Sequence, residues 1–475
     1  MQRKWKRRWQ RLAKRLMPPV AAGLLFLSAY SPAGANPAGG TVTSGNATIA
    51  TSGSTMTINQ STNKAVINWQ SFSIGRGETV NFIQPGASAV ALNRVIGSDA
   101  SAIYGTLSAN GKVYLVNPNG ILFAPGSSVN VGGLVASTLN ISDSDFLSGR
   151  YTFQKDGSAG SVVNQGAITA ANEAVFLGPQ VKNEGVVAAR VAALAAGNKV
   201  SLDFAGDRLL NVTVDTGALG GSAVNSGAIT VNGGLVVMSA GTKDALLNTV
   251  VNNSGIIRAQ TVNNVNGVIR LEGDTVVNGG MLAANGGQVK IDGAMVADTG
   301  ETDVSGSQGG NVQITADYLV QAATVNADGT DTGGTVDIKA GKIIQTASTT
   351  ISANGGAGGG SIKVEADESL LSSATFSVKG VTGGQIDLLG KNITLLAAKA
   401  DASGQSQGGQ INIGGDYQGQ GSRKQADIVY VNATTTLDAG AKSQGTGGQI
   451  VVWSNNATEY YGASSARGGA QGGDG

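Results

Sequence analysis

Three local pairs of acidic residues are the positions where this chain could carry out acid–base chemistry: Asp143 and Asp145, Asp203 and Asp207, and Glu365 and Asp367. Acids two or four residues apart on a strand face the same side, as the general acid and base of a polysaccharide-cleaving β-helix would. The pairs do not recur at a fixed spacing, and no aromatic sugar-binding platform accompanies them. We therefore interpret them as solvated strand or turn positions and predict no catalytic residue.

The 475 residues contain no His and no Cys. This composition excludes the usual Ser and Cys catalytic triads, most zinc sites and iron–sulfur ligation. No G-G-x-G-x-D nonapeptide recurs, which excludes calcium-binding repeats of that class. We expect no metal, no cofactor and no enzymatic activity.

Residues 1–35 have the pattern of a secretory signal peptide. They contain eight basic residues and no acid, followed by an apolar stretch from Met17 to Tyr30. Ala33 and Ala35 then fit the A-x-A cleavage pattern. Removing those eight basic residues from the 32 Lys and Arg leaves 24, against 31 Asp and Glu. A mildly acidic exported chain is a poor match for nucleic acid, so we expect no nucleic-acid partner.

The elements expected to position any site are β-strands that share one repeated motif, a glycine pair followed by x-apolar-x-apolar. The second glycines are Gly287, Gly310, Gly334, Gly360, Gly384, Gly409 and Gly448. Their gaps of 23, 24, 26, 24, 25 and 39 residues are typical of a solenoid, here an all-β one. The alternation predicts that Ile386, Leu388 and Ile411 face inward. Residues 417–426 are expected to be an insertion that explains the long gap, and its pair Arg423 and Lys424 is a candidate binding surface.

A second pattern, Asn-x-Gly, begins at Asn164, Asn183, Asn225 and Asn253. Asn and Gly both tolerate the backbone of a tight corner. Asn side chains stacked at one corner of successive coils can form a hydrogen-bonded ladder. We predict a structural role for these residues.

Residues 36–150 resemble the secretion domain of the filamentous haemagglutinin and high-molecular-weight adhesin family, the exported partners of two-partner secretion (TPS) systems. The resemblance is carried by INWQSFSIGRGETVNFIQ (67–84), ALNRVIG (91–97), YGTLSANGKVYLVNPNGILF (104–123) and GGLVASTLNIS (132–142). The most specific motif is Asn117-Pro118-Asn119-Gly120, followed by Ile121. Supporting positions in the first two segments are Asn68, Trp69, Asn93 and Arg94. The second family tetrad, NPNL, is absent, which places the chain nearer the high-molecular-weight adhesin branch.

The resemblance implies a right-handed parallel β-helix with a capped N-terminal secretion domain, also known as the haemagglutination activity domain. It implies recognition in the periplasm by an outer-membrane transporter bearing POTRA domains. The product would be a secreted or surface-exposed adhesin of a Gram-negative bacterium that binds a host or neighbouring cell receptor. We expect a signal peptide at 1–35 and a secretion domain at 36–160, or as far as about 280. The repetitive passenger at 161–475 would lack a C-terminal cap or continue in a longer exoprotein.

Two alternatives remain open, the stalk of a contact-dependent toxin and a β-helical polysaccharide-active enzyme. The role of the tetrad also has two interpretations. Pro118 restricts Asn117 to extended backbone, and Asn119-Gly120 suits a turn with positive φ, so the segment is predicted to be a rigid corner. The transporter either reads that corner directly or requires only the fold that it shapes.

Overall fold

The computed structural model describes residues 36–157, 160–204, 210–232, 234–241, 249–260 and 267–475. The expected signal peptide with Ala33 and Ala35, and the candidate acid Asp207, lie outside these residues. Across the described ranges, no helix combines the length and apolar character needed to cross a membrane.

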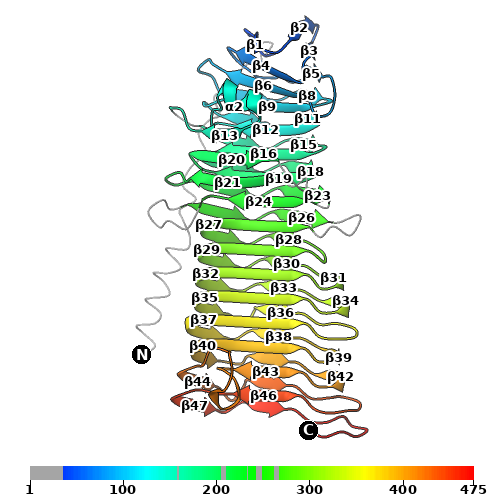
Figure 1. The fold of residues 1–475 in the computed structure, drawn as a ribbon, viewed down its shortest axis with the longest axis vertical. Helices are drawn as coiled ribbons and strands as arrows, with labels where there is room; N and C mark the ends of the chain where they lie inside the picture. Colours follow the sequence, from blue (N-terminus) through cyan, green and yellow to red (C-terminus); the bar gives the residue numbers. More distant parts are fainter. Residues whose placement is uncertain (1–35, 158–159, 205–209, 233, 242–248, 261–266) are drawn as a thin grey trace. The chain divides into compact units, whose positions relative to one another are not determined.

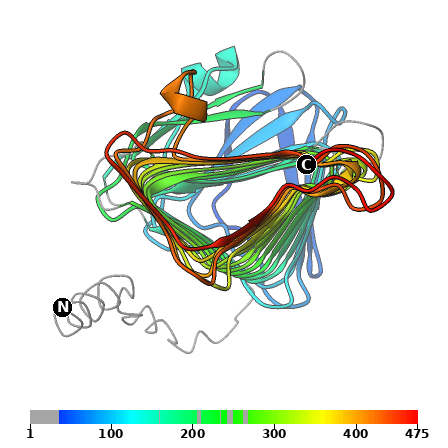
Figure 2. The same cartoon turned by 90° about the horizontal axis from the view of Figure 1, so that it is seen from below.

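The described residues between 36 and 475 form a parallel β-helix whose coils present three faces (Figures 1 and 2). We call them face 1, face 2 and face 3, in the order in which the chain passes through them. Face 1 begins with β1 (Thr41–Ser44), β4 (Lys64–Trp69), β6 (Val90–Val95), β9 (Lys112–Val116), β12 (Gly133–Ser137), β16 (Glu173–Gly178), β19 (Val191–Ala196) and β24 (Leu235–Ser239). Face 2 begins with β7 (Ser101–Ile103), β10 (Ile121–Phe123), β14 (Ser161–Asn164), β17 (Gln180–Asn183), β22 (Ser222–Asn225) and β25 (Val250–Asn253).

From β27 onward one long strand serves both faces, because its first part pairs with β24 and its second part with β25. The long strands are β27 (Val268–Asn278), β29 (Gln288–Asp298), β32 (Asn311–Gln321), β35 (Thr335–Gln345), β37 (Ser361–Ser372) and β40 (Gln385–Leu395). After β40 the two faces separate again into β43 (Gln410–Ile413) and β46 (Gln449–Val452) on face 1, and β44 (Ile428–Val431) and β47 (Ala457–Tyr460) on face 2.

Face 3 is a continuous stack that is parallel from β3 onward. Its strands are β2 (Ala47–Ser52), β3 (Thr55–Gln60), β5 (Thr79–Ile83), β8 (Thr106–Ala109), β11 (Ser128–Val131), β15 (Ala167–Ala170), β18 (Val186–Ala189), β23 (Ala228–Asn232), β26 (Ile256–Gln260), β28 (Met281–Ala283), β30 (Glu301–Asp303), β33 (Thr324–Asn326), β36 (Thr350–Ser352), β38 (Thr375–Ser377), β41 (Lys399–Asp401), β45 (Thr436–Asp438) and β48 (Ala463–Ser465).

The register confirms the coil predicted from the glycine repeats. Ile386 pairs with Ile411, which pairs with Ile450 one coil later. Ile386, Leu388 and Ile411 are fully buried in the core that runs through the coils. The 39-residue gap is largely an insertion at 414–427, between β43 and β44, that includes the short helix η1 (Tyr417–Gly419).

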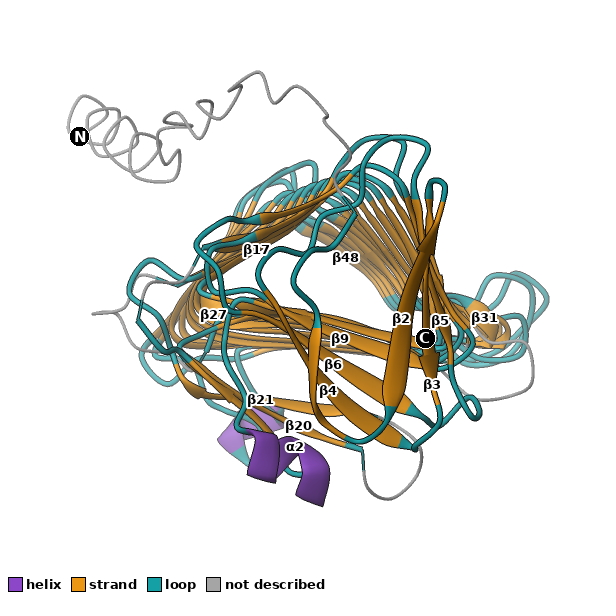
Figure 3. Ribbon diagram, turned by 90° about the horizontal axis from the view of Figure 1, so that it is seen from above, coloured by secondary structure: helices purple, strands orange, loops and turns teal. Residues whose placement is uncertain are grey.

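The glycine pairs lie where successive coils approach most closely. A Cβ on Gly334 would overlap the carbonyl oxygen of Gly310 in the coil before it. Loops at this corner project sideways and stack into a fin, in which β31 (Gly306–Gln308) pairs with β34 (Gly329–Thr332), and β39 (Gly380–Thr382) pairs with β42 (Gly404–Gln407) (Figure 3).

The N-terminal end of the core is capped as expected. Strand β1 runs antiparallel to β4, and β2 runs antiparallel to β3. Their side chains Val42, Ala47 and Ile49 pack against the core of the first coils. A solenoid needs such a cover because its terminal coil otherwise exposes apolar surface.

An unpredicted layer covers the outer side of face 1 near the N-terminus. It consists of helix α2 (Asp143–Ser148) and an antiparallel sheet of β13 (Tyr151–Gln154), β20 (Lys199–Asp203) and β21 (Asn211–Thr216). Phe146 and Phe153 pack with Tyr114 and other outward residues of face 1 in a second core cluster. Strands β12, β16 and β19 are therefore buried on both sides.

The predicted Asn ladder is present at the corner between face 2 and face 3. Asn164, Asn183, Asn225 and Asn253 are fully buried. Each Nδ2 donates to the Oδ1 of the next Asn, at 2.8 to 2.9 Å. The ladder keeps these buried amides paired, as a buried polar group requires.

The ladder continues and then reverses its direction. Asn278 donates to Oδ1 of Asp298 at 3.0 Å, but Gln321 donates back to Oδ2 of Asp298 at 3.2 Å, and Gln345 donates back to Gln321. Asp298 is fully buried, and its burial raises the pKa of the carboxyl although its hydrogen bonds oppose the shift. A carboxylate fits this position because two rows of donors meet there.

Candidate secretion-domain site

The tetrad forms the corner between β9 on face 1 and β10 on face 2. Asn117 is fully buried, and its Nδ2 donates to Asp99 O at 2.9 Å and to Ser101 Oγ at 3.0 Å. Its Oδ1 accepts from the backbone N–H of Asn119 at 3.0 Å. Both polar ends of the Asn117 side chain are therefore occupied by contacts within the chain.

The second half of the tetrad ties the corner to its neighbours. Asn119 Nδ2 donates to Gly97 O at 2.9 Å, and Gly160 N donates to Pro118 O at 2.7 Å. Gly120 has φ +123°, a conformation that side chains rarely adopt. Ile121 follows it directly and is buried in the core.

Trp69 and Asn93 form the first of two contacts among the supporting positions. The indole Nε1 of Trp69 donates to Asn93 Oδ1 at 3.0 Å inside the first coils. Asn93 Nδ2 donates to Ala91 O at 3.2 Å. The pair fixes the largest aromatic side chain of the core across the β4–β6 boundary.

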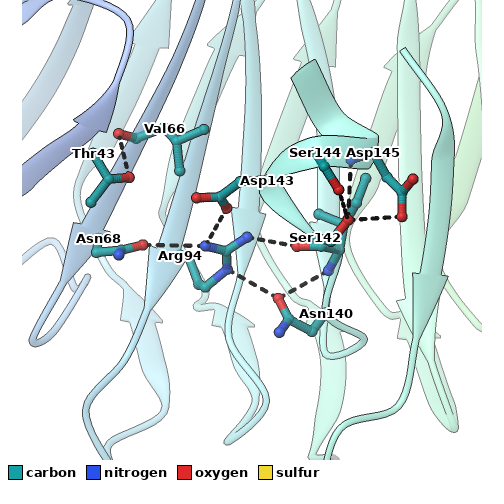
Figure 4. Close-up of polar contacts among 10 residues, drawn as sticks. Thr43, Val66, Asn68, Arg94, Asn140, Ser142, Asp143, Ser144 and Asp145 are labelled. Atoms are coloured by element: carbon teal, nitrogen blue, oxygen red, sulfur yellow. Dashed lines mark hydrogen bonds and ion pairs between the residues drawn. The ribbon is translucent and has the colours of Figure 1, made fainter. Parts of the chain in front are cut away.

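Arg94 and Asn68, the other two supporting positions, lie opposite each other on β6 and β4 and face outward (Figure 4). Arg94 Nη1 donates to Asn68 Oδ1 at 3.4 Å and forms an ion pair with Asp143 at 2.7 Å. Its Nε donates to Asn140 Oδ1 at 3.0 Å, and its Nη2 to Ile141 O at 2.6 Å. One guanidinium thus joins the first coils to the segment that leads into α2.

Lys64 holds the other end of α2 and was not predicted. Its Nζ donates to Phe146 O at 2.8 Å and Leu147 O at 2.9 Å, where the helix ends. The ammonium also lies 5.6 Å from the centres of the Phe146 and Tyr151 rings. Burial lowers the pKa of Lys64. A cation is favourable here because the carbonyls at a helix C-terminus carry partial negative charge.

Comparison with known proteins places this geometry in a family. The family model described as the TPS secretion domain matches residues 33–284, slightly more than half of the chain. The chain belongs to the TPS secretion domain family. The matched range includes the tetrad corner, the Arg94 network and α2. Proteins of this family are the exported partners of two-partner secretion, which cross the outer membrane of Gram-negative bacteria through a cognate transporter.

Two relatives and one solved structure agree with the family assignment. A heme/hemopexin-binding protein of Haemophilus influenzae strain Rd is 36% identical over 258 residues, covering 52% of this chain and 28% of that protein. A second protein of the same name and species is 32% identical over 246 residues, covering 46% of this chain and 26% of its own length. The chain therefore matches about a quarter of each relative.

The crystal structure of the HMW1 secretion domain from Haemophilus influenzae covers 90% of this chain and 99% of its own. Its TM-score is 0.56 at 23% sequence identity. This likeness shows that the TPS domain here has the β-helix fold of that protein.

Two of the three acid pairs of this TPS protein, Asp143 with Asp145 and Glu365 with Asp367, are engaged in structural contacts. Asp145 pairs with Arg150, and the hydrogen bond from Ser142 lowers the pKa of its carboxyl. Glu365 forms an ion pair with Lys363 at 2.7 Å, and the hydrogen bond from Lys424 lowers the pKa of Asp367. A general acid needs a raised pKa, so these shifts do not suit catalysis. Within the described ranges no group of acids is arranged to hold a metal ion.

The insertion at 414–427 is fastened to face 1 by the same basic pair that the sequence suggested for binding. Arg423 contacts Asp387 at 3.1 Å and Asp416 at 2.5 Å. Lys424 contacts Asp367 at 2.8 Å. These charges are neutralised within the chain, whereas the Tyr417 side chain is exposed.

Proposed function

We propose that this chain is exported by an outer-membrane transporter with POTRA domains and acts as a secreted or surface-exposed adhesin. The export half rests on one observation: the tetrad corner, the Arg94 network and α2 all lie inside the range that matches the TPS secretion domain. We propose that the signal peptide is 1–35, that the secretion domain is 36–284, and that the later coils are passenger.

We propose that the tetrad acts by shaping the fold. Asn117 is fully buried and its polar atoms are occupied, so it offers the transporter little to bind in the folded state. The corner then matters for export because it positions β10 against β7 and β14.

Deleting residues 36–150 tests the export proposal. We expect the deleted chain to enter the periplasm and to be absent from the medium of cells that express the transporter. A chain in which residues 414–427 are replaced by the three-residue bend 389–391 of β40 is the matched control and should be released normally. Release of the 36–150 deletion at the normal level would contradict the proposal.

The adhesin half is supported by the rod scaffold and by the ion pairs that four of the candidate acids form, namely Asp143, Asp145, Glu365 and Asp367. The relatives are named for binding heme and hemopexin, but the shared region is about a quarter of their length. We propose that the export route, and not the ligand, is what these proteins share. Coated beads should adhere to host or neighbouring cells and release no reducing sugar from polysaccharides. Sugar release abolished by Glu365→Gln with Asp367→Asn would instead support an enzyme.

A further inference from the structure

Face 2 carries an outward row of aliphatic side chains through the long-strand coils. Val277, Ala297, Val320, Ile344 and Leu371 stack in register, each paired with the next. Each lies between two buried residues of its strand and is itself half-buried. Alternation therefore points these five side chains away from the core.

The other two faces of the same coils are polar. The outward row of face 1 is Lys290, Gln313, Asp337 and Lys363. The outward row of face 3 is Glu301, Thr324, Thr350 and Thr375. The aliphatic row is therefore not required by the coil itself. In the sequence it appears as apolar doublets that break the alternation, such as Leu319-Val320 and Ile343-Ile344.

Among the described residues, the elements outside the coils do not cover this row. Helix α2 and the sheet of β13, β20 and β21 pack on face 1. The insertion is fastened to face 1 by Arg423, and the fin leaves the corner between face 3 and face 1 (Figures 2 and 3). An apolar row on the outer side of a sheet that no other element covers indicates an interaction surface.

The residues that continue this row toward each end of the β-helix indicate what packs against it. Toward the N-terminus Val277 is followed by Asn252, Val224 and Lys182, and toward the C-terminus Leu371 is followed by Thr394, Tyr430 and Glu459. We propose that two copies of this chain pack face 2 against face 2 with their axes antiparallel, about a two-fold axis at Val320.

This arrangement is self-complementary at each level of the coil stack, which we call a rung. It places Ala297 opposite Ile344, and Val277 opposite Leu371. The next rungs place polar Asn252 opposite Thr394, and apolar Val224 opposite Tyr430. At the ends Lys182, which also forms an ion pair with Glu184 of its own chain, meets Glu459. Parallel axes would instead place Glu459 opposite Glu459, so charge favours the antiparallel arrangement.

The size of the surface indicates the class of interface to expect. From Val224 to Tyr430 the row has nine rungs and rises by eight steps of about 4.8 Å, or roughly 38 Å, and a four-residue strand is about 13 Å wide. The two copies together would bury about 1,000 Å², near the lower limit of specific interfaces. We therefore expect a reversible dimer that forms at micromolar concentration.

Sedimentation equilibrium of the purified chain tests the proposal. We expect the apparent mass to double as concentration rises from about 1 to 100 µM. Val320→Glu places two like charges at the axis and should weaken dimerisation at least about tenfold. Thr324→Glu, on the outward row of face 3 in the same coil, is the matched control and should dimerise normally. A wild-type chain that stays monomeric throughout, or a Val320→Glu chain that dimerises normally, would overturn the proposal.

Two further variants report the orientation. Lys182→Glu should weaken the dimer, and adding Glu459→Lys should restore it. The chain has no Cys, so a single Val320→Cys should be cross-linked to its own copy by a short bis-maleimide, whereas Thr324→Cys should not. Equal cross-linking of both would contradict the two-fold axis. Binding of a monomeric wild-type chain to phosphatidylcholine vesicles, lost in Val320→Glu, would assign the row to lipid and overturn the dimer.

Discussion

The guanidinium of Arg94 lies 2.7 Å from the carboxylate of Asp143, on a segment of chain 49 residues further on. The contact joins strand β6 of the early coils to the helix that follows β12. The ion pair therefore links two parts of the secretion domain that are far apart in the sequence.

Replacing Arg94 should destabilise the protein more than its single charge suggests. Arg94→Leu leaves Asn68, Asn140, Ile141 O and Asp143 without a shared donor. We expect a loss of about 2–3 kcal/mol in the free energy of unfolding, measured by denaturant titration. Arg150→Leu is the control, because its pair with Asp145 is largely exposed and should contribute much less. Similar losses from the two variants would argue against a special role for Arg94.

The tetrad corner should be sensitive to two single substitutions. Asn117→Ala removes contacts with Asp99 O, Ser101 Oγ and Asn119 N, at a cost of about 2–4 kcal/mol. Gly120→Ala forces a side chain into positive φ at about 1–3 kcal/mol. The exposed Asn130→Ala is the control.

Export measured beside thermal unfolding separates the two interpretations of the tetrad. If the corner acts through shape, export and melting temperature should fall together in both variants. A variant that melts normally but is not released would show that the transporter reads the tetrad directly.

A charge at a predicted inward position should lower the free energy of unfolding. Leu388→Asp buries an unpaired carboxylate in the coil stack, at an expected cost of several kcal/mol. Thr350→Asp, on the outward row of face 3, should change the free energy of unfolding by less than about 0.5 kcal/mol. Thermal unfolding followed by circular dichroism distinguishes them, and an unchanged Leu388→Asp transition would contradict the assigned register.

The charge of Asp298 should make stability depend on pH. Its pKa is raised above the ordinary value of 3.8, so the folded state holds the proton after the unfolded chain has lost it. Stability then falls as pH rises from about 4 toward neutrality. Asp298→Asn removes this dependence and should be more stable at neutral pH, on the order of 1 kcal/mol. The new Asn amide can be accommodated because Gln321 and Gln345 can rotate their amides so that each donates toward the next coil. The last donor would then meet the hydroxyl of Ser372, which contacts Gln345 Oε1.

Asp298→Leu provides the comparison, since it removes the acceptor of the Asn278 Nδ2 and Gln321 Nε2 groups and should be destabilising at every pH. Melting temperatures of the three proteins between pH 4 and 7 test the assignment. Parallel pH profiles for wild type and Asp298→Asn would refute it.

The parts of the fold that repeat could be predicted from sequence because each coil repeats the same local constraints. The spacing of Gly384 and Gly409 placed Ile386 beside Ile411, and the stacked Asn residues formed the ladder expected of them. The insertion followed from one irregular gap. In each case the partner of a residue lies one coil away, at a separation that the sequence shows directly.

The layer over face 1 could not be predicted in that way. Lys64 contacts Phe146 O across 82 residues, and β13 pairs with β20 across intervening coils. The available signal was the unbroken apolar run AVFL at 174–177 within β16, because a strand buried on both sides loses its alternation. The pairing of Arg423 and Lys424 with acids was also hidden, since it depends on how the insertion folds back.

The corner between β43 and β44 has a consequence for how such a chain can change. Leu388 still pairs with Ile413, and Asn392 with Ile428, although a short bend in β40 is replaced by residues 414–427. The entropy of closing a loop grows slowly with its length, so extra sequence here adds little cost. Length added at this corner extends sideways and leaves the pitch of the stack unaltered. Evolution or protein engineering can therefore change the residues exposed at this corner while the strand pairing of the β-helix stays the same.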